Sequence, residues 1–188
     1  MIFQGQEFSA SSPFFFFADH AAQLAALVRV GRREFLHQFP SVASLDDDWL
    51  PDPADVATFE RSKLDLRERE QHAEAYALHR DLLRLRHSDH VFGEQRPGGV
   101  DGAVLGAQAF ALRFFGAHGD DRLLLVNLGV ELRLQIAPEP LLAPVADRSW
   151  QLLWSSDDWR YGGSGTAAPE TATGWVLPPE SLLVLAAR

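Results

Sequence analysis

The first half of the chain alternates apolar and polar residues at the spacing of α-helices. From about residue 71 to residue 87, apolar side chains recur three and four positions apart, on one helix face; they are Ala75, Leu78, Leu82 and Leu85. Asp19 is placed to cap another helix, which would begin near Ala21. This helix has a less regular apolar stripe, interrupted by Gly31, that consists of Leu24, Leu27, Val28 and Leu36. We predict two helices, with an ordered surface loop in the proline-rich stretch 40–57 between them.

The second half changes to the two-residue period of β-strands. Glycines and prolines gather between residues 93 and 102, and we place a domain boundary near residue 91. Beyond it, apolar and polar residues alternate in 110–114, 130–136 and 150–154, as half-buried antiparallel strands do. Segment 122–128 is a candidate return strand, and 181–185 is a candidate final strand. About five to seven short strands predict a small β-sandwich. The expected fold class is therefore α+β.

The opening residues fit neither pattern. An apolar trio, residues 1–3, is followed by polar side chains around Gly5 and then by a phenylalanine-rich loop. This is typical of the end of a buried strand, which needs a neighbour on each side for its backbone groups. We therefore expect sequence upstream of Met1 that supplies those neighbours. Without it, residues 1 to about 40 should be mobile, repacked or used in self-association.

Composition and charge narrow the functional classes. The chain has 188 residues, 46% hydrophobic and 23% charged, which is enough for a hydrophobic core. A net charge of −9 argues against a nucleic-acid partner, and we interpret the leucine-interleaved arginines Arg80, Arg84 and Arg86 as a solvated helix face. The absence of cysteine excludes disulfides and Cys-based zinc sites. The phenylalanine run at 14–17 is too short for a membrane span and lacks the basic flank of a signal peptide, so we expect a cytoplasmic protein with no membrane partner.

Several segments of the first ninety residues carry a family resemblance. They are 1–8 (MIFQGQEF), 11–14 (SSPF), 17–20 (FADH), 31–35 (GRREF), 51–53 (PDP), 58–65 (TFERSKLD) and 76–86 (YALHRDLLRLR). In this order they resemble the last barrel strand and the following region of maltooligosyltrehalose trehalohydrolases, members of the α-amylase superfamily, glycoside hydrolase family 13. The remainder is more loosely similar to the β-domain that ends such chains.

The resemblance implies both an architecture and an activity. Residues 1–90 would be the last strand, loop and helices of a catalytic (β/α)8 barrel, and residues 91–188 a C-terminal antiparallel β-sandwich. The whole enzyme would act on a maltooligosaccharide-type glucan, releasing trehalose by hydrolysis of the α-1,4 bond next to the trehalose end, with retention and without a metal or other cofactor. The family's catalytic carboxylates lie on the fourth, fifth and seventh barrel strands, in a missing N-terminal part of the barrel. We therefore expect no catalytic residue here and no hydrolysis by this chain alone.

Two alternatives stay open. The chain could be a non-catalytic β-domain with a helical arm, which binds glucan or only supports another protein. Within the enzyme class, it could be the C-terminal part of a branching or debranching relative, because these share the motif at the strand end.

The end of the predicted barrel strand supplies the candidate substrate-binding residues. The C-terminal ends of barrel strands face the active-site cleft; the residues there are Phe3, Gln4, Gln6, Glu7 and Phe8. Gln6 and Glu7 can hydrogen-bond sugar hydroxyls, and a phenylalanine can pack against a glucose ring. Alternatively, Gly5 only permits a tight turn, Glu7 forms an ion pair and both phenylalanines lie in the core. Asp19 and His20 are further candidates to line the cleft, with helix capping as the alternative for Asp19.

Three other polar groups are weaker candidates. The acidic run 46–48 lacks the ligand spacing of a calcium loop, so we interpret it as a solvated turn. His87 and His90 would need a third ligand to hold a metal, and a surface pair is the simpler interpretation. Residues 157–161 (DDWRY) resemble a carbohydrate-binding surface in composition, but with Trp150 and Trp154 they could instead close one end of the sandwich core.

Overall fold

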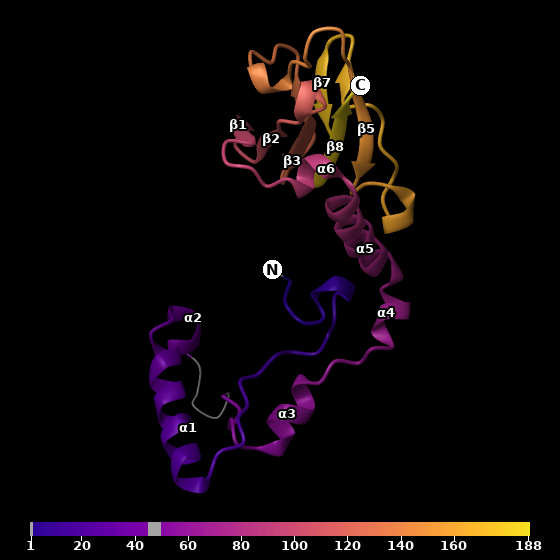
Figure 1. Ribbon diagram of the computed structural model, residues 1–188. Helices are drawn as coiled ribbons and strands as arrows, with labels where there is room; N and C mark the ends of the chain where they lie inside the picture. The colour runs from indigo at the N-terminus through magenta and orange to yellow at the C-terminus, as the bar shows by residue number, and fades with distance from the viewer. Residues whose placement is uncertain (1, 45–49) are drawn as a thin grey trace. The chain divides into compact units, whose positions relative to one another are not determined.

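The structure is a computed structural model that describes residues 2–44 and 50–188 (Figure 1). The chain divides into two compact units, Met1–His72 and Ala73–Arg188. The first unit contains helices, and the second contains a helical segment followed by β-strands. This mixture of helices and antiparallel sheet confirms the predicted α+β class. The acidic run 46–48 lies outside the described residues.

The first unit is built from short helices joined by extended chain. Its helical elements are the 3-10 turn η1 (Gln6–Phe8) and the helices α1 (Ala22–His37), α2 (Pro40–Ala43), α3 (Val56–Ser62) and α4 (Glu68–Gln71). The first predicted helix is confirmed as α1, and Gly31 does not interrupt it. The predicted cap is wrong: the N-cap is Ala21, with no side-chain hydrogen bond. The predicted loop at 40–57 contains α2 and the start of α3, where Asp55 caps the helix by accepting from the Ala57 N–H at 2.9 Å.

The predicted strand at the start of the chain is not formed by the described residues 2–5. Gly5 adopts φ +78°, and the chain then turns through η1. A Cβ at Gly5 would lie 2.6 Å from Ala10 Cβ and 2.8 Å from Leu64 Cδ2, so the turn requires glycine both for its backbone conformation and for space. A strand is held by hydrogen bonds to a neighbouring strand, and in this chain residues 2–5 take part in no strand ladder.

The second unit begins with α5 (Ala73–Ser88) and α6 (His90–Gly93), and the strands follow. The strands are β1 (Val100–Gly106), β2 (Ala109–Phe114), β3 (Arg122–Asn127), β4 (Leu132–Leu134), β5 (Trp150–Ser155), β6 (Glu170–Thr171), β7 (Gly174–Leu177) and β8 (Ser181–Ala187). Antiparallel pairing gives a five-stranded sheet in the order β1-β2-β3-β8-β5 and a three-stranded sheet in the order β4-β7-β6. Figure 1 shows the long strands β3, β5 and β8 side by side in this unit.

The two sheets enclose one hydrophobic core, as a β-sandwich does. Alternate residues of the large sheet point inward and are fully buried; they are Ala111, Leu123, Leu125, Leu183 and Leu185. The small sheet contributes Trp175 and Leu177 to the same cluster. Trp150 also joins it, and its indole Nε1 donates to the Leu142 carbonyl at 2.7 Å, which satisfies the polar atom of this buried ring. The predicted β-sandwich is confirmed.

Some strands differ from the sequence pattern. β1 lies where we predicted a glycine-rich linker, and Gly102 and Gly106 are inside it. The predicted strand 130–136 is reduced to Leu132–Leu134, because Val130 and Ile136 are 82% and 85% exposed and contribute nothing to the core. β6 and β7 are too short for the two-residue period to be recognised.

Helix α5 confirms the second predicted helix within two residues at each end. It lies in the same compact unit as the strands and packs on η5 (Trp159–Tyr161). Asp81 of α5 accepts a hydrogen bond from the Tyr161 hydroxyl at 2.9 Å. Arg80, Arg84 and Arg86 are exposed, as predicted for a solvated face. The domain boundary near residue 91 stays a prediction.

Candidate functional site

The candidate residues near the start of the chain lie on a loop that other parts of the first unit hold in place. The Gln6 side-chain carbonyl accepts from the Phe3 N–H at 3.0 Å, and the Ala10 N–H donates to the Gly5 carbonyl at 2.9 Å. These bonds close the loop on itself. Phe8 is 1% exposed and is one of the few buried side chains of this unit.

Residues far along the sequence fasten the loop to the end of the unit. The Ser11 N–H and hydroxyl both donate to the Glu68 carboxylate, at 2.7 and 2.6 Å. These two hydrogen bonds lower the pKa of Glu68, because they favour its charged form. The His72 Nδ1–H donates to the Phe8 carbonyl at 2.9 Å. Sequence analysis missed Glu68 and His72, because bonds across 57 and 64 positions follow no local pattern.

The phenylalanine-rich part of the loop is held by aromatic and hydroxyl contacts. Ring contacts link Phe3 to Phe14 at 5.4 Å, Phe14 to Phe17 at 6.1 Å, and Phe17 to Phe59 of α3 at 5.0 Å between centroids. The Phe15 N–H donates to the Ser62 hydroxyl at 3.0 Å. The loop is therefore packed along α3 although most of its rings remain partly exposed.

The predicted binding residues differ in accessibility. Phe3, Gln4 and Gln6 are exposed and Glu7 is partly buried, so these side chains can reach a ligand, whereas the Phe8 ring is covered. Asp19 and His20 are exposed just before α1. In the described part of the chain, neither of them forms a hydrogen bond or ion pair with residues 3–8. The structure thus brings the residues of the opening turn together, and the described polar contacts do not connect Asp19 or His20 to this turn.

A cavity of about 420 Å³ lies in the same unit. Its lining includes Phe14, Phe16, Arg32 and Asp52. Arg32 lies over the Phe16 ring at 5.0 Å, a cation–π contact. None of the predicted binding residues lines this cavity.

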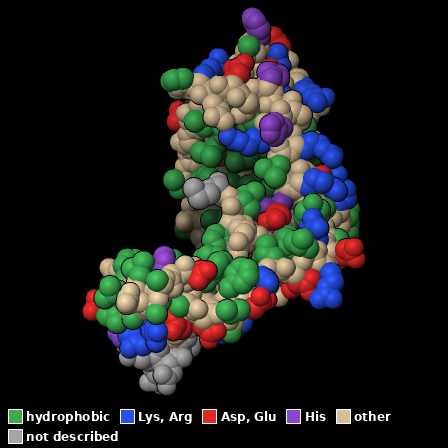
Figure 2. Space-filling view, turned by 60° about the horizontal axis from the view of Figure 1, so that its bottom comes forward, with side chains coloured by type: hydrophobic (Ala, Val, Ile, Leu, Met, Phe, Trp, Pro, Cys, Tyr) green, Lys and Arg blue, Asp and Glu red, His purple; other side chains and the backbone are tan. Residues whose placement is uncertain are grey.

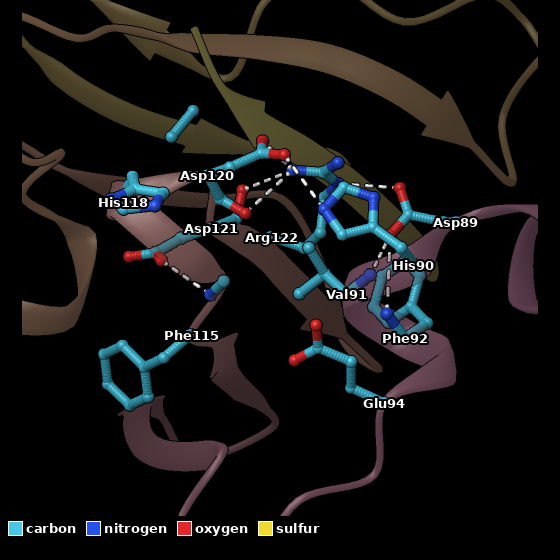
Figure 3. Close-up of polar contacts among 12 residues, drawn as sticks. Asp89, His90, Val91, Phe92, Glu94, Phe115, His118, Asp120, Asp121 and Arg122 are labelled. Carbon is cyan, nitrogen blue, oxygen red and sulfur yellow. Dashed lines mark hydrogen bonds and ion pairs between the residues drawn. The ribbon is translucent and has the colours of Figure 1, made fainter.

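The described ion pairs in which both side chains are about 10% exposed or less lie in the second unit (Figure 3). Arg122 of β3 is between Asp89, which it contacts at 2.8 Å, and Asp120, which it contacts at 2.5 Å. The hydrogen bond from Arg122 lowers the pKa of Asp120. The Asp89 carboxylate also caps α6 by accepting from the Val91 N–H at 3.0 Å. This network fastens α6 to the sheet, which is a structural role.

A second buried pair joins β2 to the turn before β3. Arg113 contacts Asp121 at 2.7 Å, and their side chains are 8% and 4% exposed. Asp121 also accepts from the Gly116 N–H at 2.9 Å. Both partners are satisfied, so the pair is closed to a ligand.

Several carboxyl groups of the described residues have a lowered pKa. Glycosidases use two carboxyl groups about 5–10 Å apart, and the acid has a raised pKa. Within residues 2–44 and 50–188, five carboxyl groups have a pKa below its usual value, because neighbouring hydrogen-bond donors stabilise the charged form; these groups are Asp65, Glu68, Asp81, Asp120 and Asp158. The same residues contain no cluster of three metal-ligating side chains, which includes the region of His87 and His90. No helix in this part of the chain is both long and apolar enough to cross a membrane.

The two aromatic rings of segment 157–161 differ in their contacts and exposure. Tyr161 stacks beside Trp154 at 5.7 Å, and its hydroxyl accepts from the Trp154 indole N–H at 2.9 Å, so these two rings close part of the β-domain. Trp159 between them in sequence is 75% exposed.

Comparison with known proteins gives three related findings. A family model described as "Domain of unknown function (DUF3459)" matches residues 97–184. The malto-oligosyltrehalose trehalohydrolase of Deinococcus radiodurans is 42% identical over 139 residues, which cover 71% of this chain and 22% of that protein. The enzyme of the same name from Mycobacterium tuberculosis H37Rv is 41% identical over 92 residues, 47% of this chain and 15% of that protein.

A solved structure extends the similarity to nearly the whole chain. The crystal structure of a Salmonella typhimurium protein assigned as an α-amylase aligns with a TM-score of 0.67 and 25% identity, over 97% of this chain and 27% of that one. The chain thus spans about a quarter or less of each of these three proteins.

Proposed function

We propose that this chain, which is homologous to the C-terminal region of malto-oligosyltrehalose trehalohydrolases, is the C-terminal part of a glycoside hydrolase that releases trehalose from trehalose-ended maltooligosaccharides. The observation that carries the proposal is the 42% identity to the Deinococcus radiodurans enzyme over 139 residues. Since the match covers 22% of that protein, most of such an enzyme lies outside the matched region. The catalytic carboxylates would belong to that other part.

In this proposal residues 1–90 complete a catalytic barrel and residues 91–188 form the domain that follows it. The exposed apolar surface of the first unit supports this arrangement. Helix α1 buries only Ala25, while Leu27 and Val30 are 70% and 56% exposed. Figure 2 shows hydrophobic side chains, in green, spread over the surface in the lower part of the view. Exposed apolar area of this kind marks a surface that is covered by another part or by a partner. In the chain by itself, the same surface would favour self-association.

The opening loop would form one wall of the substrate site. Gln4, Gln6 and Glu7 carry donors and acceptors for sugar hydroxyls, and the exposed Phe3 ring offers an apolar face for a glucose ring. Phe8, buried and held by His72, would anchor the loop rather than touch the sugar. Asp19 and His20, at the other end of the phenylalanine-rich stretch, would line the cleft farther from this wall.

The proposal is tested with a chimaera. The part of the Deinococcus radiodurans enzyme that precedes the matched region is joined to this chain, and trehalose release from malto-oligosyltrehalose is measured. We expect no activity from either part alone and activity from the chimaera. A chimaera with the thermal transition and near-ultraviolet spectrum of the parent enzyme, but without trehalose release, would contradict the proposal.

The same chimaera tests the loop. Gln4→Ala should raise KM about tenfold, the effect of one lost hydrogen bond of roughly 1–1.5 kcal/mol, with little change in kcat. The matched control is Gln151→Ala, an exposed glutamine on β5 that should leave KM unchanged. Equal KM values for the two variants would remove Gln4 from the substrate site.

The alternatives give different results. A branching or debranching enzyme would act on a maltooligosaccharide without a trehalose end as readily as on the trehalose-ended substrate. A non-catalytic β-domain would support no hydrolysis in the chimaera.

A further inference from the structure

Trp159 is an exposed aromatic ring on a β-domain whose other described tryptophans are buried. Trp150, Trp154 and Trp175 are 7–8% exposed, whereas Trp159 is 75% exposed. Its neighbour Tyr161 turns inward to Trp154 and to Asp81 of α5. The segment therefore has its own anchor, and the core does not require Trp159. A large exposed ring on a rigid segment is typical of binding sites.

The ring is held in position although it is exposed. Gly165 has φ +89°, and a Cβ there would come within 2.7 Å of Trp159 Nε1 and 3.0 Å of Cε2, so one edge of the indole lies directly against this glycine. The Gly165 N–H donates to the Asp157 carbonyl at 2.7 Å, and the Ser164 N–H donates to the Asp157 carboxylate at 2.9 Å. The loop is thus tied to the residues that precede Trp159, and little freedom would be lost when a ligand binds.

A groove of about 280 Å³ lies beside the ring. Its apolar lining includes Leu152 and Leu153 of β5, and its polar lining includes Asp158, Arg160 and Thr166. The Asp158 carboxylate accepts from the Arg160 Nε at 3.1 Å and from its backbone N–H at 2.9 Å, so the two charges neutralise each other at fixed positions. The hydrogen bond from Arg160 also lowers the pKa of Asp158, which stays an acceptor at neutral pH.

We propose that Trp159 and this groove bind an α-1,4-linked glucan, as a second carbohydrate site carried by the β-domain alone. A sugar ring has an apolar face that can stack on an indole and a rim of hydroxyls that need donors and acceptors. The groove supplies these in its guanidinium, carboxylate and hydroxyl groups. Because the charges are paired, the site selects no charged ligand, which suits a neutral polyol. Its volume is near the lower end of ligand sites, roughly 300–1,000 Å³, so it fits a single sugar ring rather than a long chain segment. The choice of an α-glucan rests on the proposed function.

The test measures binding to the full chain without any hydrolysis. Two-dimensional 1H–15N spectra are recorded with maltoheptaose, and the Trp159 indole signal is assigned from its loss in Trp159→Phe. We expect this signal to move with a Kd of about 1 mM. Trp159→Ala should weaken binding at least tenfold and Trp159→Phe less. Leu128→Ala, at a 65% exposed position of the same domain, should bind like the original chain.

Three results would overturn the site. The first is that the indole signal does not move at about 10 mM maltoheptaose, tenfold above the expected Kd. The second is that Trp159→Ala binds maltoheptaose as tightly as the original chain. The third is that the ring is protected in the trehalohydrolase chimaera before sugar is added, which would assign the ring to a contact within the enzyme. Binding of cellohexaose as tight as that of maltoheptaose would overturn the α-glucan preference. If maltoheptaose does not bind at Trp159 but the chimaera is active, only the Trp159 site is rejected. If maltoheptaose binds at Trp159 but the chimaera is inactive, only the proposed hydrolase function is rejected.

Discussion

Replacing Asp121 by asparagine removes one charge from the most deeply buried ion pair of the β-domain. The carboxylate accepts from Arg113 Nε at 2.9 Å, from Arg113 Nη2 at 2.7 Å and from the Gly116 N–H at 2.9 Å. Arg113 keeps its bonds to the Leu141 and Ala143 carbonyls, at 3.2 and 2.6 Å, so it stays in place without a counter-charge.

The loss of stability expected for Asp121→Asn follows from the burial of this ion pair. Removing one partner of a buried pair costs about 3–5 kcal/mol, because the other charge remains desolvated and unpaired. The asparagine retains one acceptor, so we expect the free energy of unfolding to fall by about 3 kcal/mol. For a domain of this size that lowers Tm by roughly 10–20 °C.

The matched control is an exposed pair in the same domain. Arg133 contacts Glu131 at 2.6 Å, but the side chains are 68% and 44% exposed. Glu131→Gln makes the same change from carboxylate to amide and should cost less than about 1 kcal/mol. Urea unfolding followed by the fluorescence of the buried Trp150 and Trp175 measures both variants. Equal losses in the two variants, or a loss below 1 kcal/mol for Asp121→Asn, would refute the reasoning from burial.

Two further predictions concern the opening loop and acid stability. Gly5→Ala should destabilise the loop by at least about 1–2 kcal/mol, because φ is +78° and the new Cβ would meet Ala10 and Leu64. At Gly31, in the middle of α1, a new Cβ would meet no other atom, so Gly31→Ala should stabilise the helix by about 0.5–1 kcal/mol. Hydrogen exchange of the Ala10 amide and of α1 measures the two effects, and changes of the same sign would contradict the loop geometry. The pKa of Asp120 is lowered from 3.8, so the stability that its ion pair with Arg122 provides is complete only above about pH 5. It is lost as the pH falls through the lowered pKa. The stability difference between the original chain and Asp120→Asn, measured by urea unfolding from pH 6 to pH 2, should therefore shrink in acid; a constant difference would exclude this linkage.

The sequence predicts those elements of the fold that carry a long, regular pattern. The helix at 73–88 was recognised because its apolar residues repeat over several turns, and β2 and β5 because theirs alternate. β3 and β8 were recognised as short apolar runs between turn residues. The strand β1 was missed because its glycines are the signal of a linker, while in the structure they lie in a ladder with β2. Neighbouring strands can supply the support that local preference does not.

The sequence predicted which residues form the candidate site, but not the residues that hold them in place. Motif resemblance pointed to residues 3–8, yet the bonds from Glu68 and His72 that hold them depend on segments 57 and 64 positions away. Trp159 illustrates the same limit. Alternation and composition place it near Trp154, but the inward turn of Tyr161 and the outward turn of Trp159 arise from contacts with α5 and Gly165.

The most direct test of the account is the ratio of two rates in the folded chimaera. These are trehalose release from malto-oligosyltrehalose and maltose release from a maltooligosaccharide of equal length. The account predicts that trehalose is released and that its rate is the larger one. A folded chimaera that releases no trehalose, or that cleaves both substrates at equal rates, would contradict the account.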